Sequence, residues 1–101
     1  MTPQLIARIT LYLTERGGRL SPILGGWKGA ESFFGCPLKI HPNDVSAWDC
    51  RILVGNESIS PGETKQFGMV FLTPEIVPVL RKLPKFYLWE GRIIGEATPD
   101  L

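Results

Sequence analysis

The chain has 101 residues, a length that suits one domain spanning residues 1–101. Hydrophobic residues make up 44% and charged residues 21%, and the formal net charge of +1 gives no basic excess of the kind that nucleic-acid-binding proteins usually show. The 11 Gly and 9 Pro punctuate short apolar runs, and the three Trp and five Phe argue against low-complexity disorder.

The first predicted element is a strand over residues 6–14. Apolar and polar side chains alternate there, as in a strand with one buried face. The apolar face comprises Ala7, Ile9, Leu11 and Leu13. A polar loop with two glycines follows over residues 15–19, and residues 20–24 form a short bent segment because Pro22 cannot donate to a strand ladder.

The middle of the chain predicts two further strands with a loop between them. The first covers residues 27–34, and its strongest part is residues 32–34. Residues 36–44 contain Pro37 and Pro42 and are predicted to be mostly loop, although residues 38–40 can add a short strand. The second strand covers residues 47–54. One of its sides presents Trp48, Cys50, Ile52 and Val54, and the other presents Asp49, Arg51 and Leu53.

Turn signals over residues 55–62 precede a strong strand over residues 64–72, both of whose faces are expected to be largely covered. Residues 74–83 are the one helix candidate. Pro74 suits the first helical position, whereas Pro78 limits the helix to one or two turns near Glu75 to Leu80. The apolar face of this helix would comprise Ile76, Val77, Leu80 and Leu83.

The last predicted element is a β-hairpin over residues 86–98. Two apolar runs flank Glu90-Gly91, and glycine adopts the positive φ that tight hairpin turns usually need. If Phe86 and Leu88 face the core, Tyr87 and Trp89 point outward. About six short strands with Gly/Pro turns and hardly any helix predict an all-β fold, either a small barrel or a sandwich.

The order of these features resembles the C-terminal β-barrel domain, domain III, of elongation factor Tu and related translational GTPases. The likeness spans nearly the whole chain. It lies in the first strand with the Gly17-Gly18-Arg19 loop and Ser21-Pro22, in the aromatic stretch 27–34, in the turn 60–63, and in the hairpin. The resemblance implies a single six-stranded antiparallel β-barrel.

The chain also departs from that family. It contains no Gly-x-x-x-x-Gly-Lys-Ser/Thr segment, so neither nucleotide binding nor GTP hydrolysis is expected. The family's second strand carries Arg and aromatic residues used around aminoacyl-tRNA, whereas Lys28 is the only cation in residues 27–34 here. Residues 36–48 have no clear counterpart in the family.

No catalytic constellation, metal site or cofactor site is predicted. His41 is the only histidine, and its spacing from Cys36 and Cys50 matches no common zinc arrangement. Free thiols are the expected state of both cysteines, although a disulfide is the alternative. An enzyme or redox protein that uses Cys36, Cys50 and His41 is the third class of function considered.

The function expected from the sequence is a non-catalytic binding or adaptor module with a protein partner. The predicted partner-binding residues are Arg16, Arg19, Trp27, Lys28, Tyr87, Trp89 and Arg92. Tryptophan is enriched among interface anchors. The alternative is a translation-related contact with tRNA or the ribosome through Arg19, Lys28 and Arg92, and the near-neutral charge favours the protein partner.

The sequence also bears on where the protein resides. No N-terminal secretory signal is recognisable, and no apolar run approaches the roughly 18 residues of a membrane span. The expected location is therefore the cytoplasm, without a membrane partner.

Overall fold

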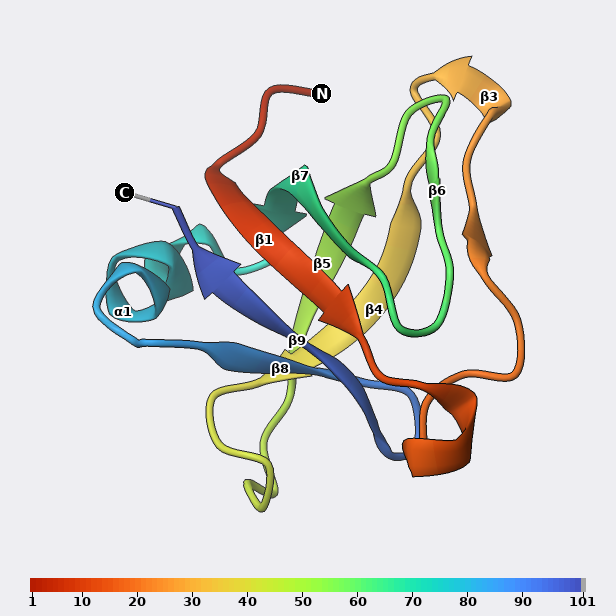
Figure 1. The fold of residues 1–101 in the computed structure, drawn as a ribbon. Helices are drawn as coiled ribbons and strands as arrows, with labels where there is room; N and C mark the ends of the chain where they lie inside the picture. The colour runs from red at the N-terminus through yellow and green to blue at the C-terminus, as the bar shows by residue number, and fades with distance from the viewer. Residues whose placement is uncertain (101) are drawn as a thin grey trace.

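Six strands close into an antiparallel barrel in the computed structural model, which describes residues 1–100 (Figure 1). Around the wall the strands follow the order β1-β7-β5-β4-β8-β9. Their bounds are β1 Leu5–Leu11, β4 Phe34–Lys39, β5 Trp48–Leu53, β7 Thr64–Phe71, β8 Phe86–Trp89 and β9 Ile93–Pro99. The prediction of an all-β, six-stranded antiparallel barrel is confirmed.

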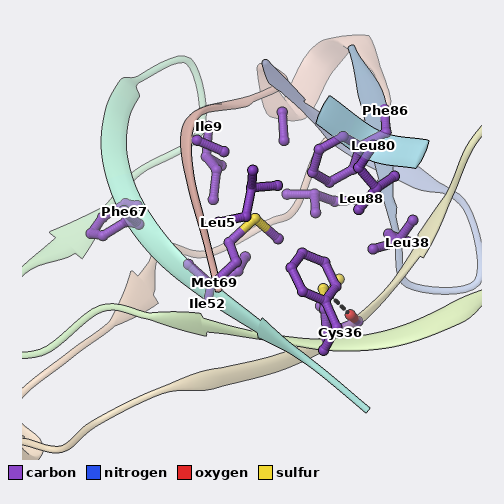
Figure 2. Close-up of a cluster of buried hydrophobic side chains, with 14 of the residues drawn as sticks. Leu5, Ile9, Cys36, Leu38, Ile52, Phe67, Met69, Leu80, Phe86 and Leu88 are labelled. Atoms are coloured by element: carbon purple, nitrogen blue, oxygen red, sulfur yellow. Dashed lines mark hydrogen bonds between the residues drawn. The ribbon is translucent and has the colours of Figure 1, made fainter. Parts of the chain in front are cut away.

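The barrel interior is built from alternate residues of each strand. In β1 the side chains of Leu5, Ala7, Ile9 and Leu11 are buried, as the alternation predicted. The other strands contribute Phe67, Met69, Ile52, Phe86 and Leu88 to the same cluster (Figure 2). Because successive strand residues point to opposite faces, this pattern leaves every second residue on the outer wall.

Two small elements cover the ends of the barrel. The helix α1 (Val77–Arg81) continues a 3-10 turn over Pro74–Ile76 and buries Ile76, Val77 and Leu80, which confirms the short predicted helix. The strands β2 (Ile23–Leu24) and β6 (Ser58–Ile59) form a separate two-stranded sheet. The pair of Ile23 and Ile59 in this sheet is buried. The segment 55–62, predicted as turns, therefore includes a short strand.

The predicted strand over residues 27–34 is wrong at its strongest part. Trp27–Ala30 is a strand (β3) whose four residues are all exposed, and Phe34 begins the next strand, but residues 31–33 between them are not in a strand. Ser32 closes a loop instead, since its hydroxyl accepts from the Lys28 amide at 2.7 Å and donates to the Gly29 carbonyl at 2.9 Å. The local hydrogen bonds of this serine compete with strand pairing.

The prediction of loop over residues 36–44 is also wrong in its first half. β4 begins at Phe34 and runs through Pro37 to Lys39. Pro37 pairs with Asp49 of β5, whereas β8 pairs with β4 at Leu38 and Lys39. Pro37 thus occupies an edge-like position, where a residue without an N–H is tolerated in a sheet.

The two remaining differences concern strand ends. β1 stops at Leu11, and the following polar segment forms a 3-10 helix over Thr14–Arg16, which leaves Leu13 exposed. Leu72 follows the end of β7 and is 77% exposed, although both faces of that strand were expected to be covered. Both residues lie just beyond the ladder that buries their neighbours.

The C-terminal hairpin is confirmed. β8 and β9 pair from Phe86 and Ala97 to Trp89 and Ile93, and Gly91 in the turn has a φ of 74°. Phe86 and Leu88 face the core. Within residues 1–100 there is no helix whose length and hydropathy would let it cross a membrane.

Candidate functional site

Arg19 joins the loop after the first 3-10 helix to the β8–β9 turn. Its Nη1 lies 2.6 Å from Oε1 of Glu90, and its Nε donates to the Ser21 carbonyl at 3.1 Å. The guanidinium carbon also lies 4.9 Å from the centroid of the Phe34 ring. Only 18% of the Arg19 side chain is exposed, so its guanidinium mainly contacts these protein groups and not solvent.

Arg92 makes the reverse connection, from the hairpin to the loop. Its Nε donates to the Gly17 carbonyl at 2.8 Å and its Nη2 to the Gly18 carbonyl at 3.0 Å. We call the contacts of Arg19 and Arg92 the loop–hairpin junction. Arg16 is exposed at its margin, and no side-chain hydrogen bond of Arg16 is found within residues 1–100.

Tyr87 and Trp89 point outward from β8, but each is half-buried beneath a lysine. The Nζ of Lys39 lies 4.9 Å from the Trp89 ring centroid and donates to the Asp44 carbonyl at 2.7 Å. The Nζ of Lys85 lies 5.9 Å from the Tyr87 ring centroid. These cation–π contacts leave both aromatic residues on the surface without forming an open aromatic patch.

Glu96 of β9 lies beside this face and accepts from two side chains. The Tyr12 hydroxyl donates to it at 3.1 Å, and Lys85 Nζ lies 3.2 Å from the same carboxylate oxygen. Burial, with a further contribution from Glu96, raises the pKa of Tyr12 to about 12. The hydroxyl therefore remains protonated near neutral pH and acts as a hydrogen-bond donor.

Trp27 is the most exposed of the predicted aromatic residues. It is 58% exposed, and its ring meets the Phe33 ring edge-on at a centroid distance of 5.5 Å. The guanidinium carbon of Arg51 lies 4.3 Å from the Phe33 centroid. We call Trp27, Phe33 and Arg51 the aromatic tip. Lys28 is exposed next to Trp27.

The seven predicted residues thus occupy three places rather than one patch. Figure 1 shows β3, with Trp27 and Lys28, at the far end of the molecule from the Thr14–Arg16 helix and the β8–β9 turn. Sequence reasoning missed Phe33 and Arg51 of the aromatic tip. The sequence grouped Arg51 with Asp49 and Leu53 on one side of its strand, but the proximity of Arg51 to Phe33 depends on the loop that Ser32 closes.

A groove also missed in the sequence crosses the outer wall of β4, β5 and β7. It has a volume of about 580 Å³, and we call it the outer groove. Its floor is the backbone at Cys36, Cys50 and Phe71, which are partners across the three strands. The residues that border it are Gly35, Pro37, Asp49, Arg51, Val70 and Leu72. Their grouping follows from strand register and has no signal in the linear sequence.

The two thiols face the core, away from the outer groove. Cys36 and Cys50 are direct partners across β4 and β5, and both are free and buried. The Cys50 thiol donates to the Cys36 carbonyl at 2.9 Å. Burial raises the pKa of Cys36 to about 12 and also raises that of Cys50. Neither thiol is therefore an activated nucleophile.

His41 belongs to an exposed loop after β4, where its backbone N–H donates to the Asp44 carboxylate at 3.1 Å. Among residues 1–100, no three His, Cys, Asp or Glu side chains gather closely enough to hold a metal ion. Comparison with known proteins finds no family model that matches this chain and no curated protein that matches it.

Proposed function

We propose that this chain is a non-catalytic binding module whose partner is a protein. The observation that supports this most directly is the exposure of Trp27 at the aromatic tip. A large side chain that remains 58% exposed on a projecting strand, backed by Phe33 and Arg51, has the composition of an interface anchor. The loss of water from its indole on binding would favour association.

The module is proposed to be of the elongation factor Tu domain III type, as a stand-alone barrel. The closed six-stranded antiparallel barrel is compatible with this resemblance. Fold likeness is an analogy for function, however, and the chain carries no P-loop. The proposal therefore extends to the barrel as a binding platform and to no GTPase activity.

An RNA contact through Arg19, Lys28 and Arg92 is the competing proposal. Two of these three cations already donate to acceptors within the protein, namely Arg19 to Glu90 and Arg92 to Gly17 and Gly18. The net charge of +1 also provides little attraction for a polyanion. Both points favour the protein partner.

The test is affinity capture from lysate with the immobilised chain, with and without RNase, at low and moderate salt. We expect capture of a protein that survives RNase and is lost in the Trp27→Ala variant. Val79→Ala is the matched control, since Val79 is an exposed apolar residue on α1, and it should capture as the wild type does. Tyr87→Ala and Trp89→Ala then show whether the β8 face belongs to the same interface.

Two results would contradict the proposal. Capture of tRNA or ribosomal material that disappears with RNase and falls steeply with salt would support the RNA contact instead. The other is capture that is equal for the wild type and for Trp27→Ala, Tyr87→Ala and Trp89→Ala. It would show that none of these aromatic residues takes part in binding the partner.

A further inference from the structure

The residues that border the outer groove lie in two parallel rows. The first row is set by the partners Gly35, Arg51 and Val70 on β4, β5 and β7. The second row is offset from the first by two residues on each of the three chain segments. It contains Pro37 and Asp49 as partners and Leu72, just after β7, whose N–H donates to the Asp49 carbonyl at 3.1 Å. Each row therefore crosses the same three strands in the same order.

The two rows are complementary to each other. Arg51 in the first row corresponds to Asp49 in the second. Gly35 has no side chain and a Cβ added there would meet open space, so this position has room for a ring, and its counterpart in the second row is the ring of Pro37. Val70 corresponds to Leu72, and both side chains are apolar. The first row of one copy could therefore pack against the second row of another copy, with opposite charges, a ring and a glycine, and two apolar side chains facing each other.

This complementarity fits a dimer with two-fold symmetry. Its axis would lie in the plane of the interface, between the two rows and parallel to them, and so perpendicular to the strands. Turning a second copy over about that axis places the first row of each copy on the second row of the other. Arg51 then faces Asp49 twice, Leu72 faces Val70 twice, and Pro37 faces Gly35 twice. An interface of this kind is isologous, because the same patch serves both partners.

We propose that the outer groove is the face through which two copies of this chain associate. Leu72 is 77% exposed in the single chain, and association would cover it. Within residues 1–100, Asp49 forms no salt bridge, and the contact found for Arg51 is with the Phe33 ring, so both charges are available to a partner.

Two properties of the whole chain agree with face-to-face association. The barrel is closed, so none of its six strands is left as a whole free edge to which another copy can add a strand. The net charge of +1 gives weak repulsion between copies. This inference goes beyond the proposed function. The outer groove shares only Arg51 with the aromatic tip, so Asp49→Arg and Leu72→Glu test the inference without altering the tip.

Sedimentation equilibrium from about 10 µM to about 1 mM protein tests the proposal. We expect the wild type to form a dimer as concentration rises. Arg51→Asp and Asp49→Arg should each raise the dissociation constant at least about a hundredfold, since each places two pairs of like charges in the interface. The double variant Asp49→Arg with Arg51→Asp restores opposite charges and should again dimerise.

The controls separate this effect from charge and folding. Lys82→Asp makes the same change in net charge as Arg51→Asp. Lys82 is exposed, directly follows α1 and does not border the groove, so this variant should dimerise as the wild type does. Circular dichroism checks that each variant folds, and Leu72→Glu provides an independent disruption. A wild type that stays monomeric throughout, a double variant that stays monomeric while folded, or equal dimerisation of every variant would overturn the proposal.

Discussion

Arg19 and Glu90, 71 residues apart in the chain, form an ion pair with 2.6 Å between Nη1 and Oε1. The loop that carries Arg19 thereby holds the β8–β9 turn. Arg92, from that turn, holds the carbonyls of Gly17 and Gly18 in the loop. Each side of the loop–hairpin junction thus contributes an arginine that donates hydrogen bonds to the other side. The main role of these two arginines is to stabilise the fold.

Arg19→Ala should lower the free energy of unfolding by about 1–2 kcal/mol, because it removes both the ion pair and the stacking on Phe34. Urea denaturation measures the change. A double-mutant cycle with Glu90→Ala should give a coupling of about 0.5–1 kcal/mol. Arg16→Ala is the control and should stay within about 0.5 kcal/mol of wild type. If the losses in free energy of unfolding caused by Arg19→Ala and Glu90→Ala simply add in the double variant, the ion pair contributes nothing to stability.

Arg92→Lys should open the Gly17–Gly18 loop locally, because an ammonium cannot reproduce the two donors of the guanidinium fork. We expect amide hydrogen exchange at Gly17 and Gly18 to accelerate at least about tenfold, the equivalent of one lost hydrogen bond. The Met69 amide in β7 is the internal control. Uniform acceleration at all three amides would indicate global destabilisation instead of a local role.

Gly18→Ala and Gly35→Ala should differ sharply in stability. A Cβ on Gly18 would overlap the Tyr12 carbonyl oxygen, which belongs to the backbone and cannot move aside cheaply. We expect that variant to lose about 3 kcal/mol. Gly35 has open space at the same position, so its alanine variant should remain within about 1 kcal/mol of wild type. Thermal unfolding followed by circular dichroism compares the two variants, and equal losses would contradict the packing at Tyr12.

Stability should fall as the pH rises above 9. Burial raises the pKa of Cys36 from 9.0 to about 12, so the folded chain retains a proton that the unfolded chain releases over that window. Each such thiol reduces the free energy of unfolding by about 1.4 kcal/mol per pH unit between the two pKa values. In the Cys36→Ala variant, the free energy of unfolding measured by urea denaturation should fall less steeply between pH 8 and pH 11. An unchanged slope would exclude the thiol as its source.

Both thiols should react slowly in the folded protein. Cys36 and Cys50 are buried with raised pKa values, so little thiolate is present near neutral pH. A disulfide exchange reagent at pH 8 should modify two thiols rapidly in urea and far more slowly in buffer. Rapid reaction of one thiol in buffer would instead support the class of function in which Cys36, Cys50 and His41 do redox or nucleophilic chemistry.

Local patterns predicted most of the barrel but not its loops. The alternation in β1, β5 and β7, the Glu90-Gly91 turn and the short helix before Pro84 were all evident in the sequence. The strand through Pro37 was missed because a proline is acceptable only where no partner needs its N–H. The strand at Ser32 was wrongly predicted because its hydroxyl bonds the backbone locally.

The candidate surfaces were less predictable than the fold. Trp27 was identified from its residue type, but Arg51 reaches Phe33 only because the loop after β3 folds back. The two rows of the outer groove combine residues from three strands, and their grouping exists only once the register is set. A shift of one residue in any of these strands would send the opposite set of side chains outward.

In β1 the sequence by itself determined which side chains face the core, and in β5 and β8 it determined which side chains share a face, since alternation reports the contrast between water and the interior. It also determined the turns, because glycine and proline restrict the backbone locally. Only the tertiary structure decided which strands are neighbours, and hence that Cys36 meets Cys50, that Arg19 meets Glu90, and that Asp49 and Arg51 border one groove. Those relationships depend on closing the barrel, a cooperative choice among long-range pairings that no local window of residues contains.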